Sequence, residues 1–415
     1  MAERETQLER LPGRVWDALV VGGGINGAVS AAALSRRGAN VALIERGDFA
    51  GFTSQQSSNL VWGGIKYLET WELGLVWRLC QSRNDLIREY PSSIKEISFL
   101  STVPRGFRYR PSFLWLGTWV YWLIGRGFTR MPKLLSKAAI RRLEPVIDIS
   151  NCRGGFEYSD AYLSDNDARF VFGFVRDALD SGCAAVNYVE ALQLRREGDL
   201  WITRVRDTIR DAEFEIRSKV VVNAAGAFVD RLNQLSDIET ACHHKFSKGI
   251  HLIVDRITPS RRVLAFFAAD GRLFFAIPMG SRTCIGTTDT SVDDPVTEVT
   301  PDDRRFVLDN INRYLVQERR LSESDIIAER CGVRPLAVKG DEAQTQDFLQ
   351  LSRRHVIEVD KAHGHLSIFG GKLTDCINVG EEVCEYLGSL GVVLPRPDAK
   401  WYGEPASAHR AEFFR

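Results

Sequence analysis

The first clear hydrophobic pattern in the chain runs from residue 16 to residue 46. An apolar stretch from Asp17 to Val21 leads into a glycine-rich turn, and an alanine-rich stretch then leads into a second apolar run, Asn40 to Ile44. Short apolar runs bounded by glycine are typical of buried strands, while the longer alanine-rich stretch has the composition of a helix. Strand, helix and strand in this order predict a βαβ unit.

The turn of this unit reads Gly22-Gly-Gly-Ile-Asn-Gly27, and the second strand is followed by an acid, Glu45. In a dinucleotide-binding unit, Gly22 permits the tight turn, Gly24 lets the backbone approach a pyrophosphate and Gly27 lets helix and strand pack closely. Glu45 is then placed to accept a ribose hydroxyl, and the helix N-terminus faces the phosphates. A helix cap built from small residues is the structural alternative. The flanking strands and the acid favour a dinucleotide.

The middle of the chain continues the α/β pattern. It predicts a helix over 165–182, a strand over 184–189, a hairpin over 192–205 and a buried strand that starts at Ser218 and ends in Asn223-Ala-Ala-Gly226. A continuous valine run suits a parallel strand covered on both faces, and the small residues Ala225 and Gly226 suit a turn across a cofactor. Because large flavoproteins commonly add such a strand to the first nucleotide unit, this segment favours FAD over NAD.

The C-terminal half predicts a different kind of sheet, followed by a return to the first. Segments 251–254, 272–278 and 283–289 have the β-branched and aromatic content of antiparallel strands, and a charged helix is expected over about 301–318. The strand Leu366 to Phe369 ends in Gly370 and Gly371, and a helix is expected from near Thr374 to about Leu387. The N-terminus of that helix would again face an anionic group.

Composition limits the possible functions. At 415 residues the chain is long enough for two interleaved lobes with a large core, and its 44% hydrophobic and 26% charged residues are ordinary for a globular protein. Lys+Arg and Asp+Glu are equal at 54 each, so net charge gives no reason to expect a nucleic acid partner. The eight cysteines form no CxxC pair, so no metal site and no disulfide framework are expected, and free thiols suit a reducing compartment.

The N-terminal residues are polar and charged, which predicts a cytoplasmic protein without a secretory signal. The longest apolar run, Phe113 to Ile124, is too short to span a bilayer, which needs about 20 residues. It contains three tryptophans and a tyrosine and has arginines on both sides. This composition suits a helix at a membrane interface, which would make the protein peripheral on the inner face of the cell membrane; a buried core helix is the equal alternative.

A Ser/Thr-rich turn, Thr53 to Ser58, precedes the segment Asn59-Leu-Val-Trp-Gly-Gly-Ile-Lys-Tyr-Leu68. Its hydroxyls and amides suit a pyrophosphate or a ribityl chain, and Gly63 and Gly64 allow close approach to a flat ring. Such clusters are more often ordinary turns, so this segment alone carries little weight.

Taken together, these blocks resemble the FAD-dependent glycerol-3-phosphate dehydrogenases and glycerophosphate oxidases, within the D-amino-acid-oxidase-like flavoproteins. The resemblance runs from about Trp16 to about Leu387. The blocks that carry it are GGGINGA, TSQQSSNLVWGGIKYLE, GGFEYSDA at 154–161, Asp167-Ala-Arg169, NAAGAFVD, Lys248-Gly-Ile-His251, GTTD at 286–289, GVRPL and FGGKLT.

The resemblance implies an α/β fold, with a Rossmann-like FAD-binding domain and an interleaved substrate domain built on an antiparallel sheet. The expected boundaries are 14–95, 160–245 and 328–392 for the FAD domain, 96–159 and 246–327 for the substrate domain, and 393–415 for a tail. It also implies hydride transfer from sn-glycerol 3-phosphate to FAD, giving dihydroxyacetone phosphate, with quinone or oxygen as the electron acceptor.

The resemblance and the residue types together give a set of site residues. Arg334, held between Gly332 and Pro335, can take a phosphate with its planar fork, Lys66 adds positive charge, and Lys372 ends the last strand. His251 can take the hydroxyl proton, although a single histidine on a strand is more often a core residue. The residues expected to bind the cofactor are Gly22, Gly24, Gly27, Glu45, Thr53, Ser54, Ser58, Gly63, Gly64, Ala225, Gly226, Gly370, Gly371, Lys372, Leu373 and Thr374.

The chain departs from the family pattern at two places. The family's His-Gly-Gly-Leu-Arg-Tyr is replaced by Trp62-Gly-Gly-Ile-Lys66-Tyr67, and the arginine that usually follows GGKLT is replaced by Asp375-Cys-Ile-Asn378. Trp62 cannot act as a base, and Lys66 keeps the charge without the fork. Three alternatives therefore stay open: another 2-hydroxy compound or phosphorylated polyol as substrate, an amine as substrate, or a flavin-binding homologue without catalysis.

Overall fold

The computed structural model describes residues 2–268, 271–340 and 354–404. The chain divides into two compact units. Unit 1 consists of residues 1–55, 165–246 and 334–415, and unit 2 of residues 56–164 and 247–333. Residues 405–415 of the expected tail lie outside the described part of the chain.

Unit 1 is built on a largely parallel sheet with the strand order β17-β18-β10-β1-β2-β7, and the hairpin β8–β9 pairs with β10. Its strands are β1 (Val15–Val21), β2 (Val41–Glu45), β7 (Ala184–Asn187), β8 (Val189–Glu197), β9 (Leu200–Asp207), β10 (Ala212–Asn223), β17 (Val356–Asp360) and β18 (His365–Phe369). β1 runs parallel to both β2 and β10, and β10 runs parallel to β18. The expected buried valine strand is therefore central in the sheet.

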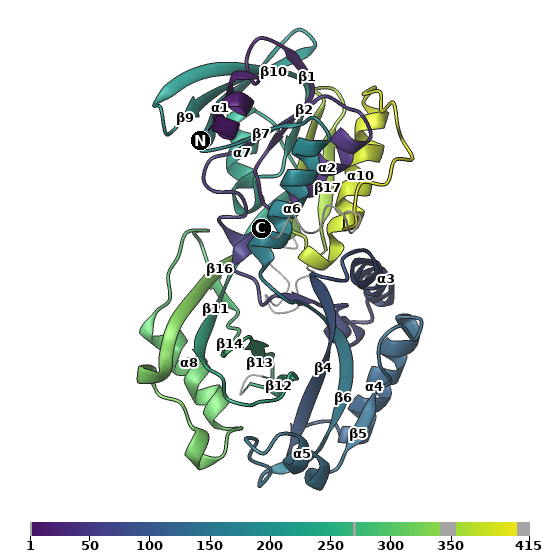
Figure 1. Cartoon of the computed structure of the whole chain (residues 1–415), viewed down its shortest axis with the longest axis vertical. Coiled ribbons are helices and arrows are strands. Elements are labelled where there is room, and N and C mark those ends of the chain that lie inside the picture. The colour runs from purple at the N-terminus through teal and green to yellow at the C-terminus, as the bar shows by residue number, and fades with distance from the viewer. Residues whose placement is uncertain (1, 269–270, 341–353, 405–415) are drawn as a thin grey trace. The chain divides into compact units, whose positions relative to one another are not determined.

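Three helices of unit 1 lie side by side, with α2 packed against both α6 and α10 (Figure 1). The helical elements are α1 (Ala2–Glu9), α2 (Ile25–Arg36), η1 (Thr53–Gln55), α6 (Asp167–Asp180), η3 (Gly226–Phe228), α7 (Val229–Leu235), η7 (Leu373–Asp375) and α10 (Cys376–Ser389). A buried cluster that includes Trp16, Leu19, Ile44 and Val221 joins the strands. Burial of such side chains from water is the main force that holds this sheet together.

Unit 2 is built on a ten-stranded sheet with the order β15-β11-β14-β13-β12-β4-β6-β3, in which β16 also pairs with β11 and β5 with β6. Its strands are β3 (Leu60–Val61), β4 (Ile94–Pro104), β5 (Lys133–Leu135), β6 (Cys152–Leu163), β11 (Cys242–Asp255), β12 (Val263–Phe267), β13 (Leu273–Met279), β14 (Arg282–Gly286), β15 (Thr290–Val292) and β16 (Ile326–Lys339). The sheet is mainly antiparallel, as expected, but β4 and β12 run parallel. The first residues of β11 and the last of β16 belong to unit 1.

Both faces of the sheet in unit 2 are covered. Adjacent residues of β12, Val263 and Leu264, belong to two different buried clusters, because side chains alternate along a strand. One cluster contains residues of α5 and α8, and the other contains residues of α3 and α4. The helical elements are η2 (Ile65–Leu68), α3 (Leu73–Glu89), α4 (Pro111–Ile124), α5 (Lys137–Leu143), α8 (Pro301–Asn312), η4 (Gln317–Arg319) and η5 (Glu323–Asp325).

The division differs from the expected boundaries in one substantial respect. Residues 56–95 were grouped with the first domain, whereas the structure places them in unit 2. The physical reason is strand pairing: β3 bonds to β6, and β4 bonds to β6 along its whole length. Helix α3, between these strands, contributes Leu75, Val76 and Leu79 to the core of unit 2.

Two expected elements are shorter than their sequence pattern. The strand predicted over 184–189 is split into β7 and β8 at Tyr188, which has a φ of 56°, outside the strand region. The charged helix predicted over 301–318 ends at Asn312, and a separate short helix follows at Gln317–Arg319. Both differences arise at backbone turns that apolar periodicity does not reveal.

Candidate functional site: a nucleotide pocket and a glycine turn in unit 1

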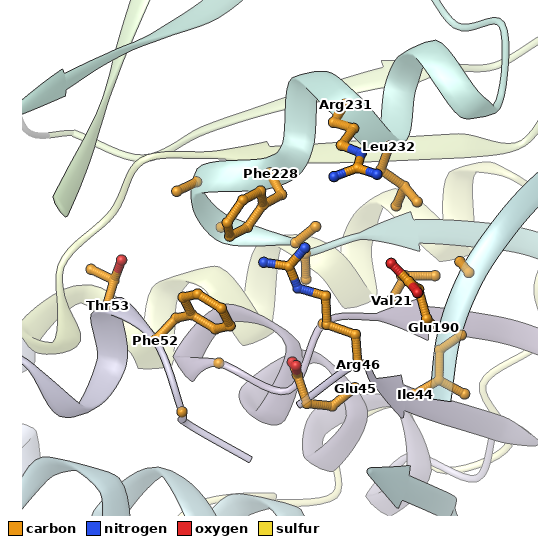
Figure 2. A pocket seen from close by; sticks show the side chains of 18 of the residues that line it. Val21, Ile44, Glu45, Arg46, Phe52, Thr53, Glu190, Phe228, Arg231 and Leu232 are labelled. Carbon is orange, nitrogen blue, oxygen red and sulfur yellow. The ribbon is translucent and has the colours of Figure 1, made fainter. Parts of the chain in front are cut away.

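A pocket in unit 1 lies where the carboxyl ends of β1, β2 and β10 meet (Figure 2). Crevices at this edge of a parallel sheet are the usual ligand sites of such folds. The pocket gathers residues from three segments that are far apart in the sequence. Those that were expected to bind the cofactor and that line it are Gly22, Gly24, Glu45, Thr53, Ser54, Ala225 and Gly226.

The turn between β1 and α2 can be built only with glycine. Gly22 has a φ of 111°, in the region that favours glycine. A Cβ on Gly27 would lie 1.8 Å from the carbonyl oxygen of Gly22, so a side chain there would push the helix off the turn. Ser54 accepts a hydrogen bond from the backbone N–H of Ile25 at 2.9 Å, which fixes η1 against the start of α2. Gly22 and Gly24 at the pocket wall therefore bring the positive end of α2 to the ligand space.

Glu45 ends β2 and lines the pocket. Its Oε2 accepts a hydrogen bond from the N–H of Gly23 at 2.7 Å, and its Oε1 accepts one from the N–H of Gly47 at 2.8 Å. These bonds fix the carboxylate across the glycine turn. Each carboxylate oxygen has a further lone pair, so a ribose hydroxyl can still donate to Glu45.

The sequence did not predict one wall of this pocket, which is aromatic and cationic. Figure 2 shows the guanidinium of Arg46 between the rings of Phe52 and Phe228; it lies 4.8 Å from the first ring centroid and 3.8 Å from the second. Glu190 and Arg231 also line the pocket. The two rings meet edge-on, with 77° between their planes, so this part of the pocket offers a cation and an aromatic surface to a flat ligand group. The available signals were the position of Arg46 next to Glu45 and the Phe228 within NAAGAFVD.

The turn at Gly370 and Gly371 is tied to the start of α2. Asn26 donates from its amide to the carbonyl oxygen of Gly370 at 3.1 Å. The two glycines have φ values of 63° and 103°, so the turn depends on residues without a side chain. The helix that was expected from near Thr374 begins as a short 3-10 turn, Leu373–Asp375, and becomes α-helical at Cys376. Lys372 lies at the N-cap of the 3-10 turn and is half-buried.

The remaining predicted residues are divided between the units. Arg334 is half-buried on β16 and belongs to unit 1, whereas Ser58, Gly63, Gly64, Lys66 and His251 belong to unit 2. His251 is buried on β11, opposite Gly286 of β14. A Cβ on Gly286 would lie 2.8 Å from the imidazole, so this glycine makes room for His251.

Gly63 has a packing role within unit 2 that the sequence did not suggest. A Cβ there would lie 2.2 Å from the hydroxyl of Tyr121. The N–H of Gly63 donates to Asp160, which also accepts from the Tyr121 hydroxyl at 2.6 Å and from Arg83 at 3.1 Å. Burial raises the pKa of Asp160, against the opposing effect of Arg83 and Tyr121. This network holds the backbone between Trp62 and Gly64.

Trp62, which replaces the family histidine, is itself fixed. Its indole N–H donates to the hydroxyl of Tyr158 at 3.3 Å, and its ring meets Phe275 edge-on with 6.3 Å between centroids. The tryptophan therefore presents a fixed aromatic surface at the position where a histidine was expected.

The residues of unit 1 fit a dinucleotide. The glycine turn, the helix N-terminus, the carboxylate of Glu45 and the aromatic and cationic surface at Arg46 supply what pyrophosphate, ribose and a base each need. These features lie together in one pocket, which favours a dinucleotide site over a helix cap built from small residues.

Comparison with known proteins agrees with this chemistry. A family model described as FAD dependent oxidoreductase matches residues 17–374. Aerobic glycerol-3-phosphate dehydrogenase of Bacillus subtilis is 30% identical over 388 residues, which cover 92% of this chain and 68% of that protein. Glycerol-3-phosphate dehydrogenase of Mycobacterium leprae is 33% identical over 378 residues, which cover 90% of this chain but 63% of that protein.

Solved structures give the same result. Glycerol-3-phosphate dehydrogenase from Bacillus halodurans in complex with FAD has a TM-score of 0.77 and 27% identity, covering 99% of this chain and 72% of that one. L-alpha-glycerophosphate oxidase from Mycoplasma pneumoniae with FAD bound has a TM-score of 0.71 at 16% identity, covering 95% and 99%, and shows the shared fold. The chain therefore belongs to the FAD-dependent oxidoreductase family, and within it to the group of the glycerol-3-phosphate dehydrogenases.

Proposed function

We propose that this chain oxidises sn-glycerol 3-phosphate to dihydroxyacetone phosphate with FAD as its cofactor, and that quinone or oxygen then takes the electrons. The observation that carries the proposal is the nucleotide pocket of unit 1, together with relatives named for this activity. The chain spans 63% of the length of the Mycobacterium leprae relative and 54% of the human mitochondrial one. The activity of these longer proteins is therefore a proposal for this chain, based on the segment that the sequences share.

The pocket would hold the nucleotide half of FAD. The N-terminus of α2, beside Gly22 and Gly24, favours the negative charge of the pyrophosphate. Glu45 would accept a ribose hydroxyl, and the guanidinium of Arg46 would stack on the adenine. Gly370 and Gly371 would let the backbone approach the flavin ring, and the start of α10 would favour negative charge on the reduced ring.

Four residues would serve the substrate. Arg334 would take the phosphate through its planar fork, and Lys66 and Lys372 would add positive charge. The bound FAD supplies the hydride acceptor. As the carbonyl of the product forms, the secondary carbon loses a hydride and its hydroxyl loses a proton, which His251 would accept at an imidazole nitrogen.

One observation favours a second candidate substrate. Trp62 is fixed by Tyr158 and Phe275 and carries no base, and Lys66 cannot form a two-pronged contact with phosphate. A related 2-hydroxy compound, another phosphorylated polyol or an amine is therefore the alternative, and loss of catalysis is the limiting case.

The substitution Arg334→Lys tests the substrate assignment. It keeps the charge but removes the fork, so the KM for glycerol 3-phosphate should rise by about tenfold, which corresponds to about 1.4 kcal/mol. Activity is followed with an artificial electron-accepting dye, and Arg330→Lys is the matched control, because Arg330 bonds to Ser57 and Asn59 within unit 2. An unchanged KM, or no turnover of glycerol 3-phosphate by the wild type while another anionic alcohol is oxidised, would contradict the assignment.

We further propose that α4 contacts a lipid surface. Within the described residues, no helix is long and apolar enough to cross a bilayer. Support for contact at the surface comes from one stripe of α4: Phe113 is 58%, Leu116 57%, Val120 44% and Leu123 64% exposed. These positions share one face of the helix, and the arginines 108, 110, 126 and 130 flank it.

Flotation with liposomes that contain anionic lipids tests this contact. The double variant Leu116→Gln, Leu123→Gln should float less than the wild type, whereas Ile209→Gln, Val393→Gln, which changes exposed apolar residues of unit 1, should not. The tryptophans 115, 119 and 122 are unsuitable targets, because they pack on one another and Trp122 donates to the carbonyl of Thr129. Equal flotation of folded wild type and double variant would reject α4 as the contact.

A further inference from the structure

The peptide of Gly370 is held on both sides by side chains from other parts of unit 1. Its carbonyl oxygen accepts from the amide of Asn26 in the first turn of α2, at 3.1 Å. Its N–H donates to Nε2 of His244, on β11, at 3.3 Å. A glycine in the left-handed region can take many other conformations, so these two bonds select one of them.

His244 is in turn fixed by Asp230 on α7. Nδ1 of His244 lies 2.8 Å from Oδ2 of Asp230, and the backbone N–H of His244 donates to the same oxygen at 3.3 Å. The imidazole is fully buried, and its ring lies 5.1 Å from the ring of Phe369, centroid to centroid. Burial opposes ionisation of Asp230, but its interactions with His244 and His243 outweigh burial and lower the pKa of Asp230.

The direction of these bonds defines the state of the imidazole. Because Gly370 donates its N–H to Nε2, that nitrogen must carry a lone pair. The single proton of the neutral ring is then on Nδ1, where it is donated to the Asp230 carboxylate. Asp230, His244 and Gly370 form a chain that runs from α7 through β11 to the glycine turn.

We propose that His244 is a positioning residue that sets the glycine turn for the flavin ring, through the acceptor lone pair of Nε2. This inference rests on the proposed function, which places the ring at Gly370 and Gly371. Lys372 follows directly, so the peptide plane of Gly370 also sets the start of the segment that carries this cation. His244 acts through the backbone and needs no contact with the cofactor.

The test compares three variants of the FAD-loaded protein. His244→Leu removes the acceptor, His244→Gln keeps one in its amide oxygen, and His243→Leu is the matched control. His243 is the neighbouring residue; it lies 3.5 Å from Asp230 but is 64% exposed. The two readouts are the dissociation constant of FAD and the midpoint potential of the bound flavin, with a thermal melt to verify folding.

His244→Leu should weaken FAD binding by about tenfold, or change the relative affinity for oxidised and reduced flavin by about tenfold, which is about 30 mV for a two-electron couple. His244→Gln should recover most of this change, and His243→Leu should match the wild type. If His244→Leu does not fold, Asp230→Asn provides a second test in a protein that keeps His244. This substitution weakens the hydrogen bond to Nδ1 and should shift the midpoint potential of the flavin.

The proposal is overturned if His244→Leu has wild-type affinity and potential, if His243→Leu changes them equally, or if His244→Gln is as impaired as His244→Leu. For Asp230→Asn, an unchanged potential overturns it. A wild type that binds no FAD would instead reject the proposed function. The two failures are therefore distinguishable.

Discussion

Gly27 is the residue at which the nucleotide site and the packing of unit 1 depend most directly on a missing side chain. Gly27→Ala would place a carbon 1.8 Å from the carbonyl oxygen of Gly22, so α2 or the turn must move. We expect a loss of about 1–3 kcal/mol in stability and loss of bound FAD, measured by thermal melts and by the ratio of flavin to protein absorbance. Gly173→Ala in α6 is the control, since nothing lies within 4 Å of its Cβ position. Normal FAD content in Gly27→Ala would contradict the proposal that close packing at Gly27 places α2 for the cofactor.

A second substitution, at Arg46, tests the aromatic and cationic wall of the pocket. Arg46→Ala removes the guanidinium from the pocket lining, and a cation–π or stacking contact between it and the adenine would be worth about 0.5–2 kcal/mol. FAD should therefore dissociate about tenfold more readily, as followed by flavin fluorescence during dilution. Arg14→Ala is the matched control, because Arg14 lies over Trp16 and is not among the residues that line the pocket. Equal changes in the two variants would refute a specific role for Arg46.

The motifs predicted those pocket residues that lie within a recognisable local motif, such as Gly22, Gly24 and Ala225. They did not predict Phe52 or His244, because no local pattern distinguishes these residues from an ordinary loop aromatic or strand histidine. Their positions follow from chain segments that meet only in the folded protein.

At the scale of elements, His355 links the segment before β17 to α10. Its Nδ1 lies 2.6 Å from Asp375, the N-cap of α10. Its Nε2 lies 2.9 Å from Glu382, in the second turn of that helix. Burial works against the charged ring, but the hydrogen bonds that His355 donates to the two carboxylates raise its pKa to about 9. Asp375, which follows GGKLT, therefore has a buried cation as its partner.

This raised pKa gives stability a defined pH dependence. The pKa of a histidine in an unfolded chain is about 6.5, so the difference from the folded state contributes up to about 3 kcal/mol to the free energy of unfolding. This contribution is fully present below pH 6.5 and is lost as the pH rises through about 9. The melting temperature of His355→Gln should thus fall furthest below the wild type near pH 6 and approach it above pH 9. His363→Gln, at an exposed pair with Asp360, is the control. A difference that stays constant over this range would rule out the charged pair.

Element types were largely predictable, because apolar periodicity and glycine placement report them directly. The parallel strands β1, β2 and β10 and the helix α6 lie where the pattern predicted. The break at Tyr188 and the early end of α8 were not predictable, because both depend on single backbone angles or caps that tertiary contacts decide.

At the scale of the whole molecule, the chain crosses between its two units four times, so each unit is assembled from distant segments. Unit 1 carries the nucleotide pocket and the glycine turn, whereas Lys66 and His251 belong to unit 2. The order of motifs predicted this interleaving, but the assignment of residues 56–95 required the strand pairs with β6.

We propose above that a flavin bound by this chain accepts a hydride from glycerol 3-phosphate. The most direct measurement is anaerobic titration of the FAD-loaded protein with sn-glycerol 3-phosphate while its visible absorbance is followed. We expect the flavin band to bleach and one dihydroxyacetone phosphate to form for each flavin reduced. A stable flavin band at saturating glycerol 3-phosphate, in protein whose flavin dithionite still reduces, would contradict it.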